Sequence, residues 1–524
     1  MQTLASFVCG RWHEGAGDQQ PLHDPTTEAQ IGQCSSSGID FAAAVRHARE
    51  VGGPALRALD FAARGAALKA LSAAVHGIRD ELIELSGRNG GSTRGDAKFD
   101  IDGATGTLAA YAALGDQLGK EMGAGRHLPD GDGVQLGRSP RFGGQHMWVS
   151  RPGVAVHVNA FNFPAWGMGE KMACALLAGV PVIEKAGTPS ALVAWRMAKA
   201  IADAGILPPG AFQFVAGGAG DLLDHLRPMD CLAFTGSSRT GLVLKGHPNL
   251  LEHNVRVNLE ADSLNAAVVG PDVEVGSDTF GLFLTNVVTD MTQKAGQKCT
   301  AVRRIFVPRP RVDDVVAALV ERLGAIKVGD PAAADTRMGP LASARQLADV
   351  RAGIGRLLEH GKAACGGPDK VFDRGYFVAP SLVVMDRPDV EVVHAEEVFG
   401  PCASVLPYDD ADVERLIELV NLGRGGLVVS LYSNDREFTE RVAFGIAPWH
   451  GRLWLGSDRV ADQALAPGMV LPQTIHGGPG RAGGGEELGG LRGLQLYMQR
   501  IAVQGFHGTV SKSFGRPQGA TSGA

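Results

Sequence analysis

The sequence predicts an α/β protein with a doubly wound parallel sheet, a second α/β domain and a small β flap. Between residues 151 and 270, short β-branched runs alternate with segments of helical period, the pattern of parallel strands joined by crossover helices. A second alternating region begins after about residue 262, and two strand candidates stand apart from both regions. The 72 glycines in 524 residues imply many turns between these elements.

Composition excludes several classes of protein. The 50 Lys and Arg against 56 Asp and Glu give a net charge of −6, and no stretch concentrates basic residues, which disfavours a nucleic-acid binder. No apolar run approaches the ~20 residues that cross a bilayer, and residues 1–11 lack a secretory signal pattern, so we expect a cytoplasmic protein. Seven widely spaced cysteines predict neither a disulfide framework nor a metal site.

The first domain combines a helical region with the doubly wound sheet. Residues 1–125 are expected to be mostly helical, in segments 41–50, 55–76 and 80–85. Pro164 suits the first turn of a helix that Gly179 ends, and Thr188 is the expected N-cap of the next helix. The predicted order is strand 154–158, helix 164–179, strand 180–184, helix 188–204, strand 212–215, helix 221–226 and strand 232–234.

Ligands of such a sheet bind beyond the carboxyl ends of its strands. We therefore expect segments 159–163, 185–188 and 235–241 to line one crevice. The turn 234–241 offers hydroxyls and backbone N–H groups where a pyrophosphate would be stabilised, although helix capping by serine explains it equally well. The chain contains no GxGxxG fingerprint.

The remaining elements predict the second domain and the flap. Strand 303–307, helix 311–323 and strand 427–432 belong to the second domain, whereas 476–493, with nine glycines, is expected to be a loop. The isolated strands 145–150 and 494–504 are expected to form a flap that docks on a second subunit, so we predict a homo-oligomer, most simply a dimer. The boundaries are 1–130 and 151–262 for a dinucleotide-binding domain, 263–480 for a catalytic domain, and 131–150 and 490–510 for the oligomerisation flap.

Two residues are candidates for chemistry. Cys299 lies in a polar, glycine-rich segment, where Lys294 and Lys298 are expected to favour its thiolate. Glu260 ends an apolar strand at the crevice, where a carboxylate can act as a general base. The alternatives are a buried structural cysteine and a solvated carboxylate at the sheet edge.

Five segments, in order, resemble the aldehyde dehydrogenase superfamily across nearly the whole chain. They are 159–164 (Asn-Ala-Phe-Asn-Phe-Pro), similar to the oxyanion segment, 234–241, similar to the cofactor turn, 259–260, similar to the general-base strand, 296–299 (Gly-Gln-Lys-Cys), similar to the nucleophile segment, and 396–401, similar to the motif around the nicotinamide ribose. One departure follows Glu260, where the family's Leu-Gly-Gly becomes Ala-Asp-Ser.

The resemblance implies a mechanism and a cofactor. Cys299 would attack an aldehyde, and Asn162 and the N–H of Cys299 would stabilise the thiohemiacetal oxyanion. Glu260 would activate the water that hydrolyses the thioester, and taking the Cys299 proton earlier is a second role open to it. Many NAD-preferring relatives carry Glu at the position of Thr188, so a neutral hydroxyl beside Lys185 predicts NADP, with NAD as the alternative. The implied cofactor contacts are Lys185, Thr188, Phe234, Thr235, Gly236, Ser237, Gly241, Glu397 and Phe399.

Within the superfamily, segments 161–171 and 477–493 resemble the semialdehyde dehydrogenases of the phenylacetyl-CoA and benzoyl-CoA ring-cleavage pathways. Because the chain ends soon after its terminal strand, we expect no fused hydratase domain, which favours the stand-alone enzymes of aerobic benzoate degradation and a CoA-thioester semialdehyde as substrate. Glu170 and Glu487 are further candidates for proton transfer. For Glu170 the alternative is a helix-surface residue paired with a lysine.

Other functions stay open at this point. An aldehyde without CoA is an alternative substrate. The fold also serves as a non-catalytic dinucleotide binder when the nucleophile is lost, but Cys299 and Glu260 argue against that class. A thiol acyltransferase would use Cys299, but it needs no nicotinamide crevice and commonly has a His close to the Cys in its motif.

Overall fold

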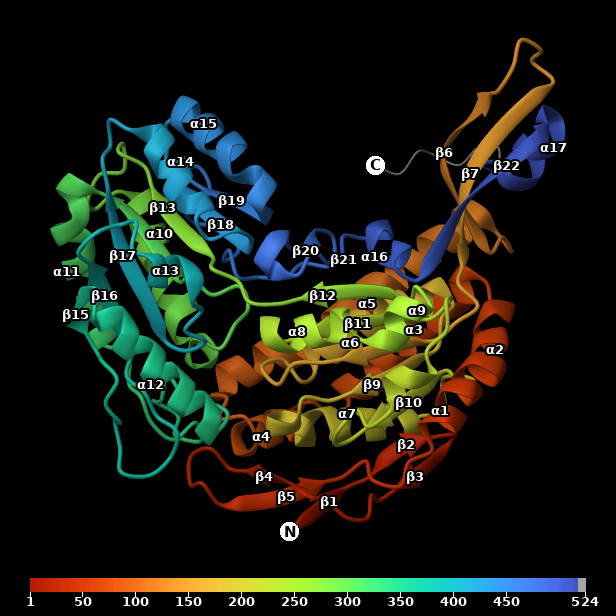
Figure 1. Ribbon diagram of the computed structural model, residues 1–524, viewed down its shortest axis with the longest axis horizontal. Helices are drawn as coiled ribbons and strands as arrows, with labels where there is room; N and C mark the ends of the chain where they lie inside the picture. Colours follow the sequence, from red (N-terminus) through yellow and green to blue (C-terminus); the bar gives the residue numbers. More distant parts are fainter. Residues whose placement is uncertain (517–524) are drawn as a thin grey trace.

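The computed structural model describes residues 1–516. In this part of the chain two seven-stranded sheets form two lobes, and a three-stranded flap projects beyond them (Figure 1). The mixed α/β fold is the one that the sequence predicts. Among the described residues, no helix is long and apolar enough to cross a membrane.

The first sheet has the strand order β12-β11-β8-β9-β10-β2-β3, with β2 and β3 antiparallel at one edge and the other neighbours parallel. From β8 the chain winds outward through β9 to β10 and then returns to β11 and β12 on the other side. The direction of winding therefore reverses between β8 and β11, as expected of a doubly wound sheet. The strands are β2 (Ser6–Val8), β3 (Arg11–His13), β8 (Ala155–Val158), β9 (Val182–Lys185), β10 (Phe212–Val215), β11 (Cys231–Thr235) and β12 (Arg256–Glu260).

Helix α6 (Trp166–Ala178) confirms the helix predicted after Pro164, and Gly179 ends it with a left-handed φ of 85°. Helix α5 (Arg94–Met122) crosses α6 so closely that a Cβ on Gly103 would lie 2.2 Å from the Trp166 ring. The other helices of this lobe are α1 (Phe41–His47), η1 (Ala48–Gly52), α2 (Gly53–Ala58), α3 (Phe61–His76), α4 (Arg79–Arg88), η2 (Thr188–Ser190), α7 (Ala191–Asp203), η3 (Leu222–His225), α8 (Ser238–Lys245) and α9 (Pro248–Glu252).

For this lobe, one expectation holds except at its start and two are wrong. Residues 1–125 are mostly helical, as expected, but the first 34 are not, because β2 and β3 extend the main sheet while β1 (Gln2–Leu4), β4 (Gln20–His23) and β5 (Gln30–Cys34) form a small sheet. Their partners include residues far along the chain, such as Phe214 opposite Phe7, which local periodicity does not reveal. Thr188 caps no helix, since its Oγ1 donates to Gln20 Oε1 at 2.9 Å, and 188–204 divides into η2 and α7. Segment 221–226 forms only the 3₁₀ turn η3.

The second sheet has the order β15-β16-β17-β14-β13-β18-β19, and only β15 is antiparallel to its neighbour. Its run β17-β14-β13-β18-β19 repeats the winding of β10-β9-β8-β11-β12. The strands are β13 (Ala266–Val269), β14 (Arg304–Pro308), β15 (Gly361–Cys365), β16 (Ser381–Met385), β17 (Cys402–Tyr408), β18 (Gly426–Tyr432) and β19 (His450–Gly456). The helices are α10 (Asp278–Thr292), η4 (Gln293–Gly296), η5 (Arg309–Arg311), α11 (Val312–Gly324), α12 (Ala344–Leu358), α13 (Glu391–Ala395), α14 (Val413–Asn421), α15 (Arg436–Ile446) and η6 (Ala447–Trp449).

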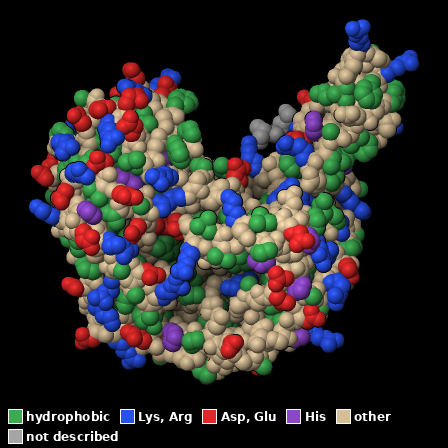
Figure 2. Space-filling view, in the orientation of Figure 1, with side chains coloured by type: hydrophobic (Ala, Val, Ile, Leu, Met, Phe, Trp, Pro, Cys, Tyr) green, Lys and Arg blue, Asp and Glu red, His purple; other side chains and the backbone are tan. Residues whose placement is uncertain are grey.

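The two isolated strands do pair with each other. β7 (Phe142–Ser150) and β22 (Met498–Phe506) run antiparallel over their whole lengths, and β6 (His127–Gln135), which the sequence did not reveal, completes the flap. Helix α17 (His507–Phe514) follows β22. Figure 2 shows hydrophobic side chains on this projection, and the exposed large ones are Val134, Leu136, Phe142, Ile501 and Phe506.

The glycine-rich run is more ordered than the predicted loop. Strands β20 (Ile475–Gly477) and β21 (Glu486–Leu488) form an antiparallel hairpin, with η7 (Gly480–Ala482) inside it and α16 (Leu491–Gln495) after it. Glycines with positive φ, such as Gly483 at 104°, allow the turns that bring two very short strands together. Because α16 occupies the start of the predicted strand 494–504, β22 begins only at Met498.

Candidate functional site

A cavity lies where the two lobes meet. Asn162 follows β8, Glu260 ends β12, and Cys299 precedes β14, yet all three side chains line this one cavity. Its other lining residues are Phe99, Ala160, Phe163, Trp166, Gly167, Glu170, Lys171, Thr235, Thr300, Gly468, Val470 and His476. The sequence-predicted nucleophile, donor and carboxylate are therefore neighbours in space.

The loop that carries Cys299 is held from behind by buried side chains. Asn265 Nδ2 donates to the carbonyl oxygen of Cys299 at 2.7 Å. Arg303 Nη2 donates to the carbonyl oxygens of Gly296 and Lys298 at 3.0 and 3.2 Å. A Cβ on Gly296, whose φ is 67°, would lie 2.2 Å from the Gly400 carbonyl oxygen, so glycine is required there. The backbone around the sulfur is thus fixed before any ligand binds.

The expectation that lysines favour the Cys299 thiolate is wrong. Lys298 Nζ pairs with Asp290 at 2.8 Å. Lys294 Nζ lies 3.4 Å from Ser92 Oγ and 4.8 Å from the centroid of the Phe163 ring. Burial, together with the charge of Glu260, raises the pKa of the Cys299 thiol well above its ordinary value. The thiol is therefore protonated at rest and needs a base.

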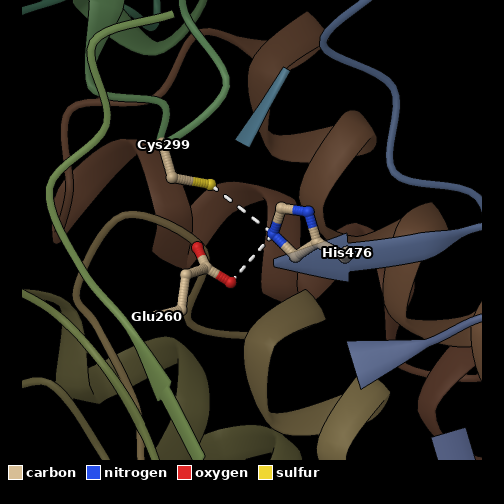
Figure 3. Close-up of side chains that lie close together, drawn as sticks. All are labelled: Glu260, Cys299 and His476. Carbon is tan, nitrogen blue, oxygen red and sulfur yellow. Dashed lines mark hydrogen bonds and ion pairs between the residues drawn. The ribbon is translucent and has the colours of Figure 1, made fainter. Parts of the chain in front are cut away.

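Sequence reasoning missed His476, which comes from β20 in the glycine-rich run. Its Nε2 lies 2.9 Å from Glu260 Oε2 and 3.8 Å from Cys299 Sγ, and both side chains point to this edge of the imidazole (Figure 3). The three polar atoms lie within 4.8 Å of one another. Burial favours the neutral carboxyl group, but His476 outweighs it, so the pKa of Glu260 is well below its ordinary value. No sequence spacing signals this contact, because 177 residues separate His476 from Cys299.

A second cluster of charges lies beside this group. Lys171 Nζ lies 3.4 Å from Glu170 Oε1 and 3.2 Å from Glu487 Oε2, and all three side chains are buried. Asn258 Nδ2 donates to Glu487 Oε1 at 3.2 Å. Burial raises the pKa of Glu170 to about 7, Lys171 opposes that change and Glu487 adds to it. Glu170 is paired with a lysine, as one alternative held, but it faces the cavity rather than solvent.

Asn162 combines one structural contact with a place on the cavity wall. Its side chain is buried, and Nδ2 donates to the Gln297 carbonyl oxygen at 3.1 Å. An amide nitrogen carries two hydrogens, so this contact fixes the side chain and leaves one donor for a ligand.

The predicted cofactor residues follow β9 and β11 or lie on the facing lobe. Ser237 Oγ accepts from Thr240 N at 3.3 Å, so this serine does cap α8. Thr235 Oγ1 is buried and has no hydrogen-bond partner within residues 1–516. A Cβ on Gly236 would lie 2.5 Å from the Phe234 ring. An orphaned hydroxyl beside a turn that excludes side chains fits the close approach of a dinucleotide. Lys185 ends β9 and Thr188 opens η2. The other predicted contacts on this lobe lie at the end of β11, in the turn before α8 or in α8 itself, and they are Phe234, Thr235, Gly236, Ser237 and Gly241.

Glu397 and Phe399, the other two predicted cofactor contacts, lie on the segment between α13 and β17 of the second lobe. Glu397 Oε2 accepts from Ser263 N at 3.1 Å, Oε1 lies 3.4 Å from Arg303 Nε, and burial raises the pKa of Glu397 to about 7. Phe399 packs edge to face on Phe161, with ring centroids 6.0 Å apart. In the segment that departs from the superfamily, Asp262 Oδ1 accepts from Ser238 N at 2.9 Å.

Comparison with known proteins agrees with this geometry. The aldehyde dehydrogenase family matches residues 12–501. The chain is 42% identical to the 3,4-dehydroadipyl-CoA semialdehyde dehydrogenase of Aromatoleum evansii, over 99% of each chain. Its fold matches lactaldehyde dehydrogenase from Escherichia coli with a TM-score of 0.83, at 24% identity, over 96% of this chain and 99% of that one. The NAD+ complex of an aldehyde dehydrogenase from Bacillus cereus gives a TM-score of 0.82, at 24% identity, over 96% and 97%.

Proposed function

Because this chain belongs to the aldehyde dehydrogenase family, we propose that it oxidises 3,4-dehydroadipyl-CoA semialdehyde to the carboxylic acid with NADP. The observation that carries the reaction is the convergence of Cys299, Glu260 and Asn162 on one cavity. The substrate is proposed from the name and high coverage of the Aromatoleum evansii relative.

The site residues fit three steps of this reaction, and the cofactor would serve the fourth. Cys299 Sγ attacks the aldehyde carbon, forming a C–S bond while the carbonyl oxygen becomes an oxyanion. Asn162 Nδ2 and the backbone N–H of Cys299 donate to that oxyanion; one donor of this kind is worth about 3 kcal/mol. When held by Lys185, Thr188 and the turn before α8, oxidised NADP would supply the hydride acceptor that the oxidation of the thiohemiacetal to a thioester requires. Glu260 then takes a proton from water, whose hydroxyl displaces the sulfur and releases the acid.

Glu170 and Glu487 are proposed to carry protons away from Glu260. Glu170 lines the same cavity, and Lys171 joins the two carboxylates through contacts of 3.4 and 3.2 Å. The pKa of Glu170 near 7 suits a group that gains and loses a proton at neutral pH.

The NADP preference is proposed from Lys185 and Thr188. Lys185 ends β9, and Thr188 opens η2 three residues later, bonded through its hydroxyl to Gln20. A cation and a neutral hydroxyl, rather than a carboxylate, at these two positions support the binding of a 2′-phosphate. The other proposed cofactor contacts are those of the α8 turn, with Glu397 and Phe399 at the nicotinamide ribose.

The flap is proposed to join two subunits, and the domain boundaries predicted above are kept as part of this proposal. Five large hydrophobic residues are exposed on the flap, four on its strands and Leu136 directly after β6. Exposed apolar side chains on a projecting sheet favour a partner of the same kind.

A thiol acyltransferase is the second candidate, and one observation favours it. His476 Nε2 lies 3.8 Å from Cys299 Sγ, so the His that its chemistry needs is present in space although not in the motif. A non-catalytic dinucleotide binder has no comparable support, because nucleophile and base both line the cavity.

A panel of short aliphatic, long aliphatic and CoA-linked semialdehydes, each with NADP or NAD, tests the proposal. We expect reduced nicotinamide to form fastest with the CoA-linked substrate and NADP, and not at all in Cys299→Ala. Acyl transfer without formation of reduced nicotinamide would favour the acyltransferase. Tight NADP binding with no turnover of any aldehyde would favour the binder.

A further inference from the structure

The hairpin β20–β21 determines the position of His476. β20 pairs with β21 so that His476 lies opposite Glu487, and the side chain of His476 is only 3% exposed. A Cβ on Gly451 of β19 would lie 1.8 Å from the Gly477 carbonyl oxygen, so the hairpin packs directly against the second sheet. The backbone therefore fixes the imidazole at the sulfur.

One edge of this imidazole carries its polar contacts. Nε2 meets both Cys299 Sγ and Glu260 Oε2, whereas Nδ1 is buried without a hydrogen-bond partner in residues 1–516. Glu260 pairs with the ring through Oε2, which lies 2.9 Å from Nε2. Nε2 is therefore the ring atom that faces both the carboxylate and the sulfur, and it is the atom through which the ring can exchange a proton with Sγ.

The charged groups around the ring set its protonation. Glu260 on β12, Glu170 and Lys171 on α6, Glu487 on β21, Arg452 on β19 and the Cys299 thiol surround it. Burial alone would lower the pKa of His476, but Glu260 and then Glu170 outweigh burial and Arg452, so the pKa is raised. The ring is consequently a stronger base than an ordinary histidine.

The two candidate bases differ in how well they match the thiol. The pKa of Glu260 is lowered, which makes this carboxylate a weak base, while the pKa of the Cys299 thiol is raised. The raised pKa of His476 lies closer to that of the thiol, and proton transfer is easier between matched groups.

We propose that His476, rather than Glu260, is the base that takes the thiol proton of Cys299. In this step the S–H bond breaks, its electron pair stays on the sulfur, and the proton bonds to the lone pair of Nε2. The imidazolium is then paired with the Glu260 carboxylate, which remains ionised for the later reaction with water. The role of this step in aldehyde oxidation rests on the proposed function, whereas the proton transfer itself does not.

Alkylation of Cys299 by iodoacetamide, without cofactor or aldehyde, tests the transfer. The rate is followed by mass spectrometry of the Cys299 peptide, because Cys9 and Cys365 are also partly exposed. In the native chain we expect the rate to rise with pH through an inflection above 6.5, the ordinary value for histidine. His476→Ala is expected to lower the rate at neutral pH roughly tenfold or more, and added imidazole to restore it through the cavity.

Two variants serve as comparisons. His476→Gln fills the space without supplying a base, so we expect the same loss and no rescue by imidazole. His450→Gln removes a buried histidine of β19 whose Nδ1 contacts the Ile446 carbonyl oxygen, and it should leave the alkylation rate unchanged.

Alkylation of His476→Ala at the native rate and with the native pH profile would overturn the proposal. If thermal unfolding shows that the His476 variants do not fold, the native profile decides, and an inflection at or below pH 6.5 counts against the base. A chain that oxidises no CoA-linked semialdehyde would refute the proposed function but leave this measurement intact.

Discussion

The two seven-stranded sheets are wound in the same order, yet they present opposite edges to the cavity between them. From the first sheet, the carboxyl ends of β11 and β12 provide Thr235 and Glu260. From the second, Cys299 lies on the segment that leads into the amino end of β14. One edge offers side chains at strand ends, and the other offers a nucleophile on a backbone loop.

The reason lies in the connection between the sheets. β12 ends at Glu260 and β13 begins at Ala266, so the short segment 261–265 leads from the carboxyl edge of one sheet directly to the amino edge of the next (Figure 1). The rule that ligands bind at carboxyl ends therefore predicts half of this site and is silent on the other half. The second edge needs buried polar side chains, such as Asn265 and Arg303, to hold its loops.

Glu260→Gln is expected to have the largest effect and tests the first edge. If Glu260 acts only on the thioester, steady-state turnover should fall roughly 10³-fold while the first burst of reduced nicotinamide persists. Rapid-mixing kinetics measure both. Loss of both the burst and the turnover would mean that Glu260 also activates the sulfur. The carboxylate at the first edge would then take part in both steps of the reaction.

Arg303→Met tests the second edge. It removes the donor to the Gly296 and Lys298 carbonyl oxygens and leaves Glu397 buried without its cation, so we expect about 3 kcal/mol less unfolding free energy. Urea unfolding measures this change. Arg309→Met, a neighbouring but exposed arginine, is the control and should change little. Equal small losses in both variants would show that the loop does not depend on Arg303.

Glu170→Gln tests how a buried carboxyl group at the first edge changes the stability of the fold with pH. The pKa of Glu170 is about 7 in the folded chain against 4.5 as its ordinary value, so the folded state binds more protons between these values. Native stability due to this group is thus present below pH 4.5 and is lost as pH rises through about 7. The variant lacks this loss, so its stability relative to the native chain should rise across that window by on the order of 3 kcal/mol. A pH-independent difference in chemical unfolding would contradict the buried titration.

Thr188→Glu has the smallest expected effect, because this residue is only half-buried. A carboxylate there should repel the 2′-phosphate, and we expect the ratio of kcat/KM for NADP over NAD to fall about tenfold. Thr285→Glu adds the same charge at an exposed position on α10 as the control. An unchanged ratio in Thr188→Glu would remove the argument for NADP at this position.

Much of the fold could be predicted because it depends on neighbours in the chain. The helix from Pro164 to Gly179 and the strand β10 follow from local periodicity and capping. Strands β1–β5 could not be predicted, since they are only three to five residues long and the pairing of β2 with β10 joins residues far apart in the chain. The hairpin β20–β21 could not be predicted either, because its many glycines are typical of a loop.

The site also has one part that could be predicted from local sequence and one part that could not. Segments around Asn162, Glu260 and Cys299 identified the candidate residues and the family, because such motifs are contiguous in the chain. The charge state of these groups depends on the tertiary structure. In the folded chain Lys294 and Lys298 contact other partners, and His476 Nε2 lies 3.8 Å from the sulfur and 2.9 Å from the carboxylate. Protonation depends on burial and on charges within a few ångströms, and neither quantity is a property of the sequence order alone.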